Sequence, residues 1–253
     1  MCLILFSWKN HPDYDLIIAT NRDEFYSRKT AKLDFWQAYP EVLAGRDLQA
    51  GGTWMGITKS GRFTAITNYR DPQLKRKDTL SRGFLTRNYL VQDLSPPEYL
   101  QLVRNDHDKY FGFNLLVGNQ KELWYYNNIS DRIIELKPGN YTLSNAFLNT
   151  SWPKTDSGRV LFEAKLKGRI NEEDFFSILN TRTNSEDTKL PKTGISIEWE
   201  RAISPIFIET ESYGTCSSSL LRIGTNGEVN FTEKTHVISD KRNNPVSFQF
   251  KIS

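Results

Sequence analysis

Two apolar runs near the N-terminus constrain the fold more than any other part of the sequence. Residues 3–8 (LILFSW) and 14–20 (YDLIIAT) are rich in branched and aromatic side chains. Residues 10–13 (NHPD) join them as a polar turn segment that contains a proline. Neither run alternates cleanly between apolar and polar residues, which is typical of strands buried on both faces. The chain is therefore predicted to begin with a pair of core strands.

Further strand-like segments follow along the chain. A hairpin is predicted at residues 54–69, where the turn KSGR separates WMGIT from FTAITNY. Four later segments, separated by Gly or Asn turns, predict a meander, and three more strands are predicted towards the C-terminus. These segments are residues 111–118, 122–128, 132–139 and 141–147, followed by 204–209, 214–223 and 229–234. Residues 22–36 show no clean period and are predicted to form a long surface excursion.

Helices are predicted in two separate blocks, at residues 80–94, 95–105, 157–168 and 171–180. Ser95 precedes two prolines, which suit a first helical turn, and the acidic NEED segment suits the start of the last helix. Residues 181–200 are polar and show no pattern. Strands at both ends and in the middle indicate a layered α+β fold. No repeat or linker divides the chain, so residues 1–253 are predicted to form a single domain.

Composition and charge argue against several functional classes. The chain is 38% hydrophobic with 15 Phe, 11 Tyr and 6 Trp, which indicates a folded protein. A net charge of +3, with one basic concentration at residues 69–82, predicts a solvated loop and no nucleic-acid partner. The N-terminal apolar run is too short for a signal or membrane segment. Two cysteines provide no disulfide framework, so a cytoplasmic protein without an integral membrane segment is expected.

Few residues are available for catalysis. Only His11, His107 and His236 could act as imidazole bases, and each lies in a polar context typical of the surface. No HExxH, CxxC or P-loop pattern occurs, so neither a metal site nor a required cofactor is predicted.

Cys2 is the remaining candidate nucleophile. It is either a small buried apolar residue, as most free cysteines are, or a catalytic group. Removal of Met1, which ordinarily occurs before a residue as small as cysteine, would expose an α-amino group with a pKa of about 7.7–8.0. That amine can accept the thiol proton without a histidine. Both interpretations remain open at this level.

The second apolar run ends in four polar residues: Asn21, Arg22, Asp23 and Glu24. At least some of them are predicted to lie at the mouth of the strand pair that contains Cys2. There Arg22 could hold a carboxylate, and Asp23 could orient the new amino group. The alternative is a charged turn that closes a strand.

Several motifs together resemble the NRDE family, also called the transport and Golgi organisation protein 2 family. They occur in the family's order and extend over nearly the whole chain. The motifs are MC at the start, NRDEFYSR at 21–28, GGTWMGI at 51–57, TNYR at 67–70, FNLL at 113–116, LSNA at 143–146 and YGT at 213–215.

The resemblance implies an N-terminal nucleophile (Ntn) hydrolase-like fold, a four-layer αββα sandwich. Cysteine amidases of that fold also begin Met-Cys and use an asparagine in a segment similar to Leu143-Ser144-Asn145. By this resemblance Cys2 is the nucleophile, Asn145 is an oxyanion donor, and Arg22 or Asp23 position the reacting groups. Asn68 is a second candidate oxyanion donor. An oxyanion donor is typically worth about 3–4 kcal/mol. Candidate ligand-binding residues are Asn21, Glu24, Trp54, Tyr69, Arg70 and Tyr213.

Two departures from the pattern accompany the resemblance. The amidases space their Arg and Asp three apart, whereas Arg22 and Asp23 are adjacent, and neighbours on a strand face opposite sides. Cys216 stands where the family often has Arg, and a thiol cannot replace a fixed positive charge.

The family is also linked to haem trafficking and to lipid or acyl-coenzyme A handling. The leading expectation is a hydrolase of a small non-peptide amide or thioester. The alternative is a carrier of a small-molecule or lipid-like ligand, with haem as a possible transported ligand, and a secretory-pathway or Golgi organisation factor is a third. The oligomeric state is not determined by the sequence.

Overall fold

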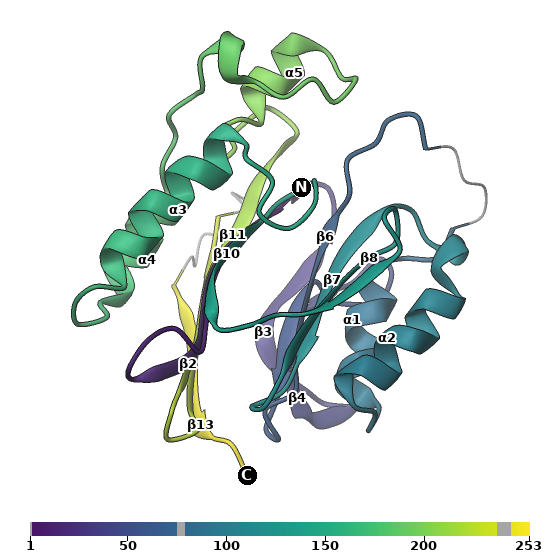
Figure 1. The fold of residues 1–253 in the computed structure, drawn as a ribbon, viewed down its shortest axis with the longest axis vertical. Helices are drawn as coiled ribbons and strands as arrows, with labels where there is room; N and C mark the ends of the chain where they lie inside the picture. Colours follow the sequence, from purple (N-terminus) through teal and green to yellow (C-terminus); the bar gives the residue numbers. More distant parts are fainter. Residues whose placement is uncertain (1, 75–78, 237–243) are drawn as a thin grey trace.

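The computed structural model describes residues 2–74, 79–236 and 244–253. Two antiparallel sheets lie face to face, and helices cover the outer face of each sheet (Figure 1). This arrangement is the four-layer αββα sandwich that the sequence predicts.

The first sheet has six strands in the order β10-β1-β2-β11-β12-β13. Its members come from both ends and the middle of the chain: β1 Cys2–Trp8, β2 Tyr14–Phe25, β10 Gly139–Leu143, β11 Tyr213–Gly224, β12 Glu228–Thr235 and β13 Val246–Lys251. The N- and C-terminal segments therefore lie in the same sheet, as the sequence predicts.

The second sheet is a meander in which each of seven strands pairs with the next one in the chain. Its strands are β3 Thr30–Trp36, β4 Tyr39–Asp47, β5 Met55–Thr58, β6 Phe63–Asn68, β7 Phe113–Gly118, β8 Leu123–Asn127 and β9 Arg132–Glu135.

Helices form the two outer layers. Those in the described ranges are α1 Gly83–Val91, α2 Pro96–Asn105, α3 Pro153–Lys165, α4 Glu172–Leu179 and α5 Ile197–Ala202, with short 3-10 segments at His107–Lys109 and Asp187–Lys189. α1 and α2 cover the second sheet, while α3 and α4 cover the first (Figure 1). α2 begins as the sequence predicts, because Ser95 and Glu98 form a capping box.

Alternation along β1 divides its side chains between two cores. Ile4 and Phe6 join the apolar core between the sheets, whereas Leu3 and Leu5 pack towards α3 and α4. Successive side chains on a strand point to opposite faces, so a strand buried on both faces reads as a continuous apolar run. This explains the unbroken sequence LILF.

The structure corrects two strand predictions. Residues 22–36 are not a surface excursion, because β2 continues to Phe25 and β3 begins at Thr30. The polar end of β2 stays in the sheet since β1 and β11 pair with it on both sides. The predicted four-strand meander is also wrong in its last member. β10 leaves the second sheet and pairs with β1, which would otherwise have an unpaired edge.

Residues 204–209 are not a strand, although Ile206, Phe207 and Ile208 are all buried. Their backbone amides donate to partners outside a ladder: Phe207 N–H to the Thr181 carbonyl and Ile208 N–H to the Thr215 hydroxyl. The polar region 181–200 is not wholly irregular either, because α5 begins at Ile197. The sequence analysis also missed β4 and β13.

No helix within the described ranges combines the length and the apolar character needed to cross a membrane.

Burial in the core between the sheets predicts the effect of a truncation there. Leu116 on β7 is 0% exposed in this core, so Leu116→Ala should lower the free energy of unfolding by about 2–5 kcal/mol. Leu102→Ala is the matched control, because Leu102 is 53% exposed on α2 and should lose about 1 kcal/mol or less. Chemical denaturation of both variants measures the difference, and equal losses would contradict this placement of the core.

Candidate active site

Cys2 and Arg22 are direct partners across β1 and β2. Opposite residues of an antiparallel pair present their side chains on the same face. This face is the one between the sheets, because Ile4 and Ile18 further along these strands belong to that core. Arg22 therefore lies beside the thiol of Cys2.

Asp23 faces the opposite, helix-covered side of the first sheet. Its Oδ1 accepts a hydrogen bond of 2.8 Å from the Thr215 hydroxyl. Its backbone still reaches Cys2, because a hydrogen bond from the Asp23 backbone stabilises the Cys2 thiolate. The strand does not turn between Arg22 and Asp23, so the two side chains diverge as neighbours on a strand do.

Trp54 from the second sheet covers Arg22. The guanidinium carbon lies 4.4 Å from the indole centroid, which is a cation–π contact across the gap between the sheets. Gly45 makes this possible, because a Cβ there would overlap the indole ring of Trp54. The indole ring thus limits where the Arg22 guanidinium can lie beside Cys2.

The GGTW segment is held by the start of α1. The Thr53 amide donates to the Gly83 carbonyl, and the Thr86 hydroxyl donates to the Thr53 carbonyl at 2.5 Å. A Cβ at Gly52 would overlap the backbone of Gly83. This close approach brings Arg82, the residue before α1, to the same place as Trp54.

These residues surround a cavity of about 330 Å³, hereafter the Cys2 cavity. Six of the predicted site residues contribute to its wall: Cys2, Arg22, Asp23, Glu24, Trp54 and Asn68. The remaining wall is formed by Arg28, Asp47, Thr53, Ile66, Thr79, Leu80, Ser81, Arg82, Gly83 and Phe111. Its size is at the lower end of the range of small-molecule sites.

Burial controls the chemistry of Cys2. It raises the pKa of the Cys2 thiol above its ordinary value, and the positive charge of Arg22 opposes that shift. Burial therefore disfavours the thiolate form of Cys2. Met1 itself lies outside the described residues.

Asn145 joins the two sheets next to the Cys2 cavity. It is 0% exposed, and its side-chain amide donates to the Asn68 carbonyl at the end of β6. The Ser144 hydroxyl donates to the Cys2 carbonyl at 2.9 Å and also contacts the Asn145 oxygen. Asn145 does not contribute to the cavity wall, and one of its two amide hydrogens is engaged. Its role as an oxyanion donor stays a prediction.

Four other predicted ligand-binding residues lie away from the Cys2 cavity. Asn21 faces the helices, where its amide donates to the carbonyls of Leu179 and Ile206. Tyr213 is buried on that side and donates to the Asp23 carbonyl.

The other two belong to the segment that follows β6. Arg70 forms a 2.7 Å ion pair with Glu200 and stacks on Trp152. The Tyr69 ring packs on Phe147, with 5.0 Å between centroids.

Comparison with known proteins identifies the family. A sequence profile described as Transport and Golgi organisation 2 matches residues 1–237. The Bos taurus Transport and Golgi organization protein 2 homolog is 35% identical over 262 residues, which cover 95% of each chain. The chain belongs to the Transport and Golgi organisation 2 family. The Drosophila melanogaster member of this family is 26% identical and covers 93% of this chain and 92% of its own.

Solved structures show what fold this Transport and Golgi organisation 2 family member has. The C2A mutant of the conjugated bile acid hydrolase from Clostridium perfringens superposes with a TM-score of 0.56. The match covers 100% of this chain and 97% of the hydrolase at 11% sequence identity. The sandwich is therefore of the Ntn-hydrolase type.

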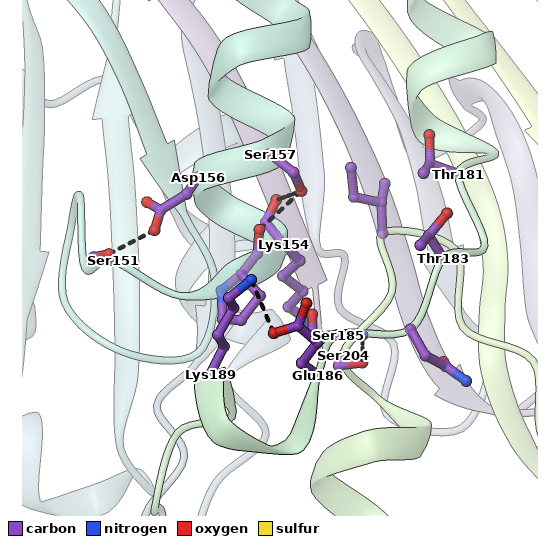
Figure 2. Close-up of a pocket in the computed structure, with 13 residues that line it drawn as sticks. Ser151, Lys154, Asp156, Ser157, Thr181, Thr183, Ser185, Glu186, Lys189 and Ser204 are labelled. Atoms are coloured by element: carbon purple, nitrogen blue, oxygen red, sulfur yellow. Dashed lines mark hydrogen bonds and ion pairs between the residues drawn. The ribbon is translucent and has the colours of Figure 1, made fainter.

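A second cavity, of about 740 Å³, lies on the helix side of the first sheet (Figure 2). Figure 2 shows Lys154 in the first turn of α3, with Thr181 and Thr183 across the cavity. Lys154 is only 4% exposed, and burial lowers its pKa to about 8 against the opposing charge of Asp23. Lys154 and Asp23 are thus interacting charges on the face of the sheet opposite Cys2.

The sequence analysis missed Arg82, Arg28 and Lys154. Arg28 belongs to the NRDEFYSR motif, so its position in the motif was an available signal. Arg82 and Lys154 lie at the starts of helices in segments without a chemical pattern. Only the packing of α1 brings Arg82 to the Cys2 cavity, and only the packing of α3 brings Lys154 to the second cavity. Within the described ranges, no three His, Cys, Asp or Glu side chains gather as metal ligands would.

The charge of Arg22 predicts how the reactivity of Cys2 depends on pH. Arg22→Gln should move the midpoint of Cys2 alkylation by iodoacetamide to higher pH, because the charge that lowers the thiol pKa is lost. Arg22→Lys, which keeps the charge, should stay close to the wild-type midpoint. Peptide mass spectrometry across a pH series measures the rate at Cys2. An unchanged midpoint in Arg22→Gln would contradict the placement of Arg22.

His236 predicts a pH dependence of stability. Its ring nitrogen contacts the Ser218 hydroxyl at 2.9 Å, and Ser218 in turn donates to Asn21. Burial lowers the pKa of His236 from 6.5 to about 4. As the pH falls, the histidine of the unfolded chain is therefore protonated before that of the folded protein. Stability should therefore fall as pH drops from 6.5 towards 4, and less so in His236→Gln. Thermal melts of both proteins across this range test it, and parallel losses would refute it.

Proposed function

We propose that the protein is a cysteine hydrolase that cleaves a small non-peptide amide or thioester, with Cys2 as the nucleophile. The observation that carries the proposal is the position of the Cys2 thiol in the wall of a cavity, directly opposite Arg22. The fold supports it, since the conjugated bile acid hydrolase of Clostridium perfringens is built on the same sandwich.

The reaction requires the removal of Met1. The free α-amino group of Cys2 then takes the thiol proton, and the sulfur attacks the substrate carbonyl carbon. As the C–S bond forms, the bond to the leaving amine or thiol breaks, and the amino group passes the proton to that leaving group. Water then cleaves the acyl-enzyme and releases the carboxylic acid. Of the two proposed oxyanion donors, Asn68 lines the cavity and Asn145 does not.

A carrier function is the second candidate. Two observations favour it: burial raises the pKa of the Cys2 thiol, and the Asn145 amide is engaged by Asn68. Such a carrier would hold a lipid-like ligand, an acyl-coenzyme A or haem in the Cys2 cavity, against Trp54 and Phe111. No feature of the site speaks for a role in Golgi organisation beyond the family name.

The hydrolase proposal predicts a covalent intermediate. Intact mass of the purified protein should show the loss of Met1, and incubation with p-nitrophenyl butyrate should add one butyryl group to Cys2. Cys2→Ala should abolish this addition and lower p-nitrophenol release by at least about a hundredfold. Cys216→Ala is the matched control and should react like the wild type, because the Cys216 thiol is buried within β11.

Retention of Met1 in the active protein would refute the mechanism. The carrier predicts a different pattern: haem or an acyl-coenzyme A should bind wild type and Cys2→Ala with equal affinity, without acylation of Cys2. Absorbance titration with haem and fluorescence titration through Trp54 measure these affinities. Failure of both ligands to bind would eliminate the carrier.

A further inference from the structure

Arg82 is a cation in the Cys2 cavity without a carboxylate partner. Its Nη1 donates to the Gly112 carbonyl at 3.1 Å, and no carboxylate oxygen of the described residues lies within 4.0 Å of its guanidinium. Arg82 is half-buried, and it lies within Coulombic reach of Glu24 and of the Cys2 thiolate without forming an ion pair with either. A desolvated guanidinium in this position retains donors for a further acceptor.

The carboxylates near the cavity are already occupied. Asp47 forms a 2.5 Å ion pair with Arg28, and it also accepts from the backbone amides of residues 49 and 50. Glu24 lies 3.8 Å from Arg22 and 3.9 Å from Arg28. The third carboxylate of the wall, Asp23, accepts a hydrogen bond from the Thr215 hydroxyl, so Arg82 is the arginine of the wall that forms no ion pair with a described residue.

Arg22 is a second arginine of the wall with open hydrogen-bond donors. Its side chain is 7% exposed and makes no hydrogen bond to any described residue. Its contacts are the face of Trp54 and the distant Glu24 oxygen. A buried guanidinium with open donors is expected to have a hydrogen-bonding partner.

We propose that Arg82, with Arg22, makes the Cys2 cavity selective for compounds that carry a carboxylate near the atom presented to Cys2. A ligand carboxylate would supply the ion pair that Arg82 lacks, and the planar guanidinium fork matches the two carboxylate oxygens. The acyl part of the substrate is therefore that of a dicarboxylic acid monoamide or monothioester. This statement about the substrate rests on the proposed function, whereas the binding of a carboxylate does not.

Alkylation of Cys2 tests the anion site without turnover. Iodoacetate and iodoacetamide form the same C–S bond with loss of iodide. Iodoacetate carries a carboxylate where iodoacetamide carries a neutral amide. We compare the alkylation rate with iodoacetate to the rate with iodoacetamide, at Cys2 and at the thiol of glutathione. The iodoacetate-to-iodoacetamide ratio at Cys2, divided by that for glutathione, should be about ten or more in wild type. This is the factor expected of one charge-assisted hydrogen bond. Because both reagents attack the thiolate, a change in the thiol pKa cancels in this ratio.

Variants of Arg82 identify the residue responsible. R82Q should bring the ratio close to that of glutathione, and R82K should retain part of the preference. E24Q, which leaves Arg82 intact, should raise the ratio, because it removes a competing carboxylate from the cavity. A wild-type ratio equal to that of glutathione, or the same ratio in R82Q as in wild type, would overturn the proposal. If R82Q does not fold, the wild-type and E24Q ratios still decide it.

A second measurement separates this proposal from the hydrolase itself. p-Nitrophenyl hemisuccinate should acylate Cys2 faster than p-nitrophenyl butyrate in wild type, and R82Q should remove the difference. If iodoacetate is preferred but neither ester acylates Cys2, the anion site stands and the hydrolase fails. If the butyrate ester acylates Cys2 and no carboxylate is preferred in either assay, the hydrolase stands and the anion site fails.

Discussion

The register between β1 and β2 is the constraint on which the site depends. Cys2 pairs with Arg22, and the same register places Ile4 opposite Thr20 and Phe6 opposite Ile18. A slip of one residue would exchange the side chains of β1 between the two cores, so the packing of Ile4 and Phe6 between the sheets also fixes the partner of Cys2. The packing of residues further along β1 thus determines which side chain lies opposite Cys2 at the end of the strand.

Polar contacts between the sheets hold the rim of the Cys2 cavity. The Asn145 amide joins β10 to the end of β6, and the Thr67 hydroxyl donates to the Ser144 carbonyl. Asn114 on β7 donates to Thr67. These four residues belong to the TNYR, FNLL and LSNA motifs. Several motif residues therefore act as buried structural connections, where an unpaired amide would be costly. A motif is not by itself a set of ligand-binding residues.

The predictable part of the fold is the part with strong local signals. Strand-like sequence segments predicted β1, β2 and β11, because strands buried on both faces contain runs of apolar residues. Ser95 and the prolines that follow it predicted the start of α2. Residues 204–209 have the composition of a strand but lie in a buried loop, whose amides find partners in Thr181 and Thr215. β10 resembles its neighbours in sequence but pairs with β1, because only long-range pairing selects its sheet.

The sequence by itself determined the composition of the site's centre: a cysteine directly after Met1, an arginine at the end of the second strand, and too few histidines for a dyad. Its strand and helix pattern also indicated a layered α+β fold, and its resemblance to a known family implied the αββα sandwich. Only the tertiary structure decided which polar residues share the Cys2 cavity. Alternation along β2 sends Arg22 and Asp23 to opposite faces, and the packing of α1 on the second sheet brings Arg82 to Cys2, because contacts between distant segments are set by core burial.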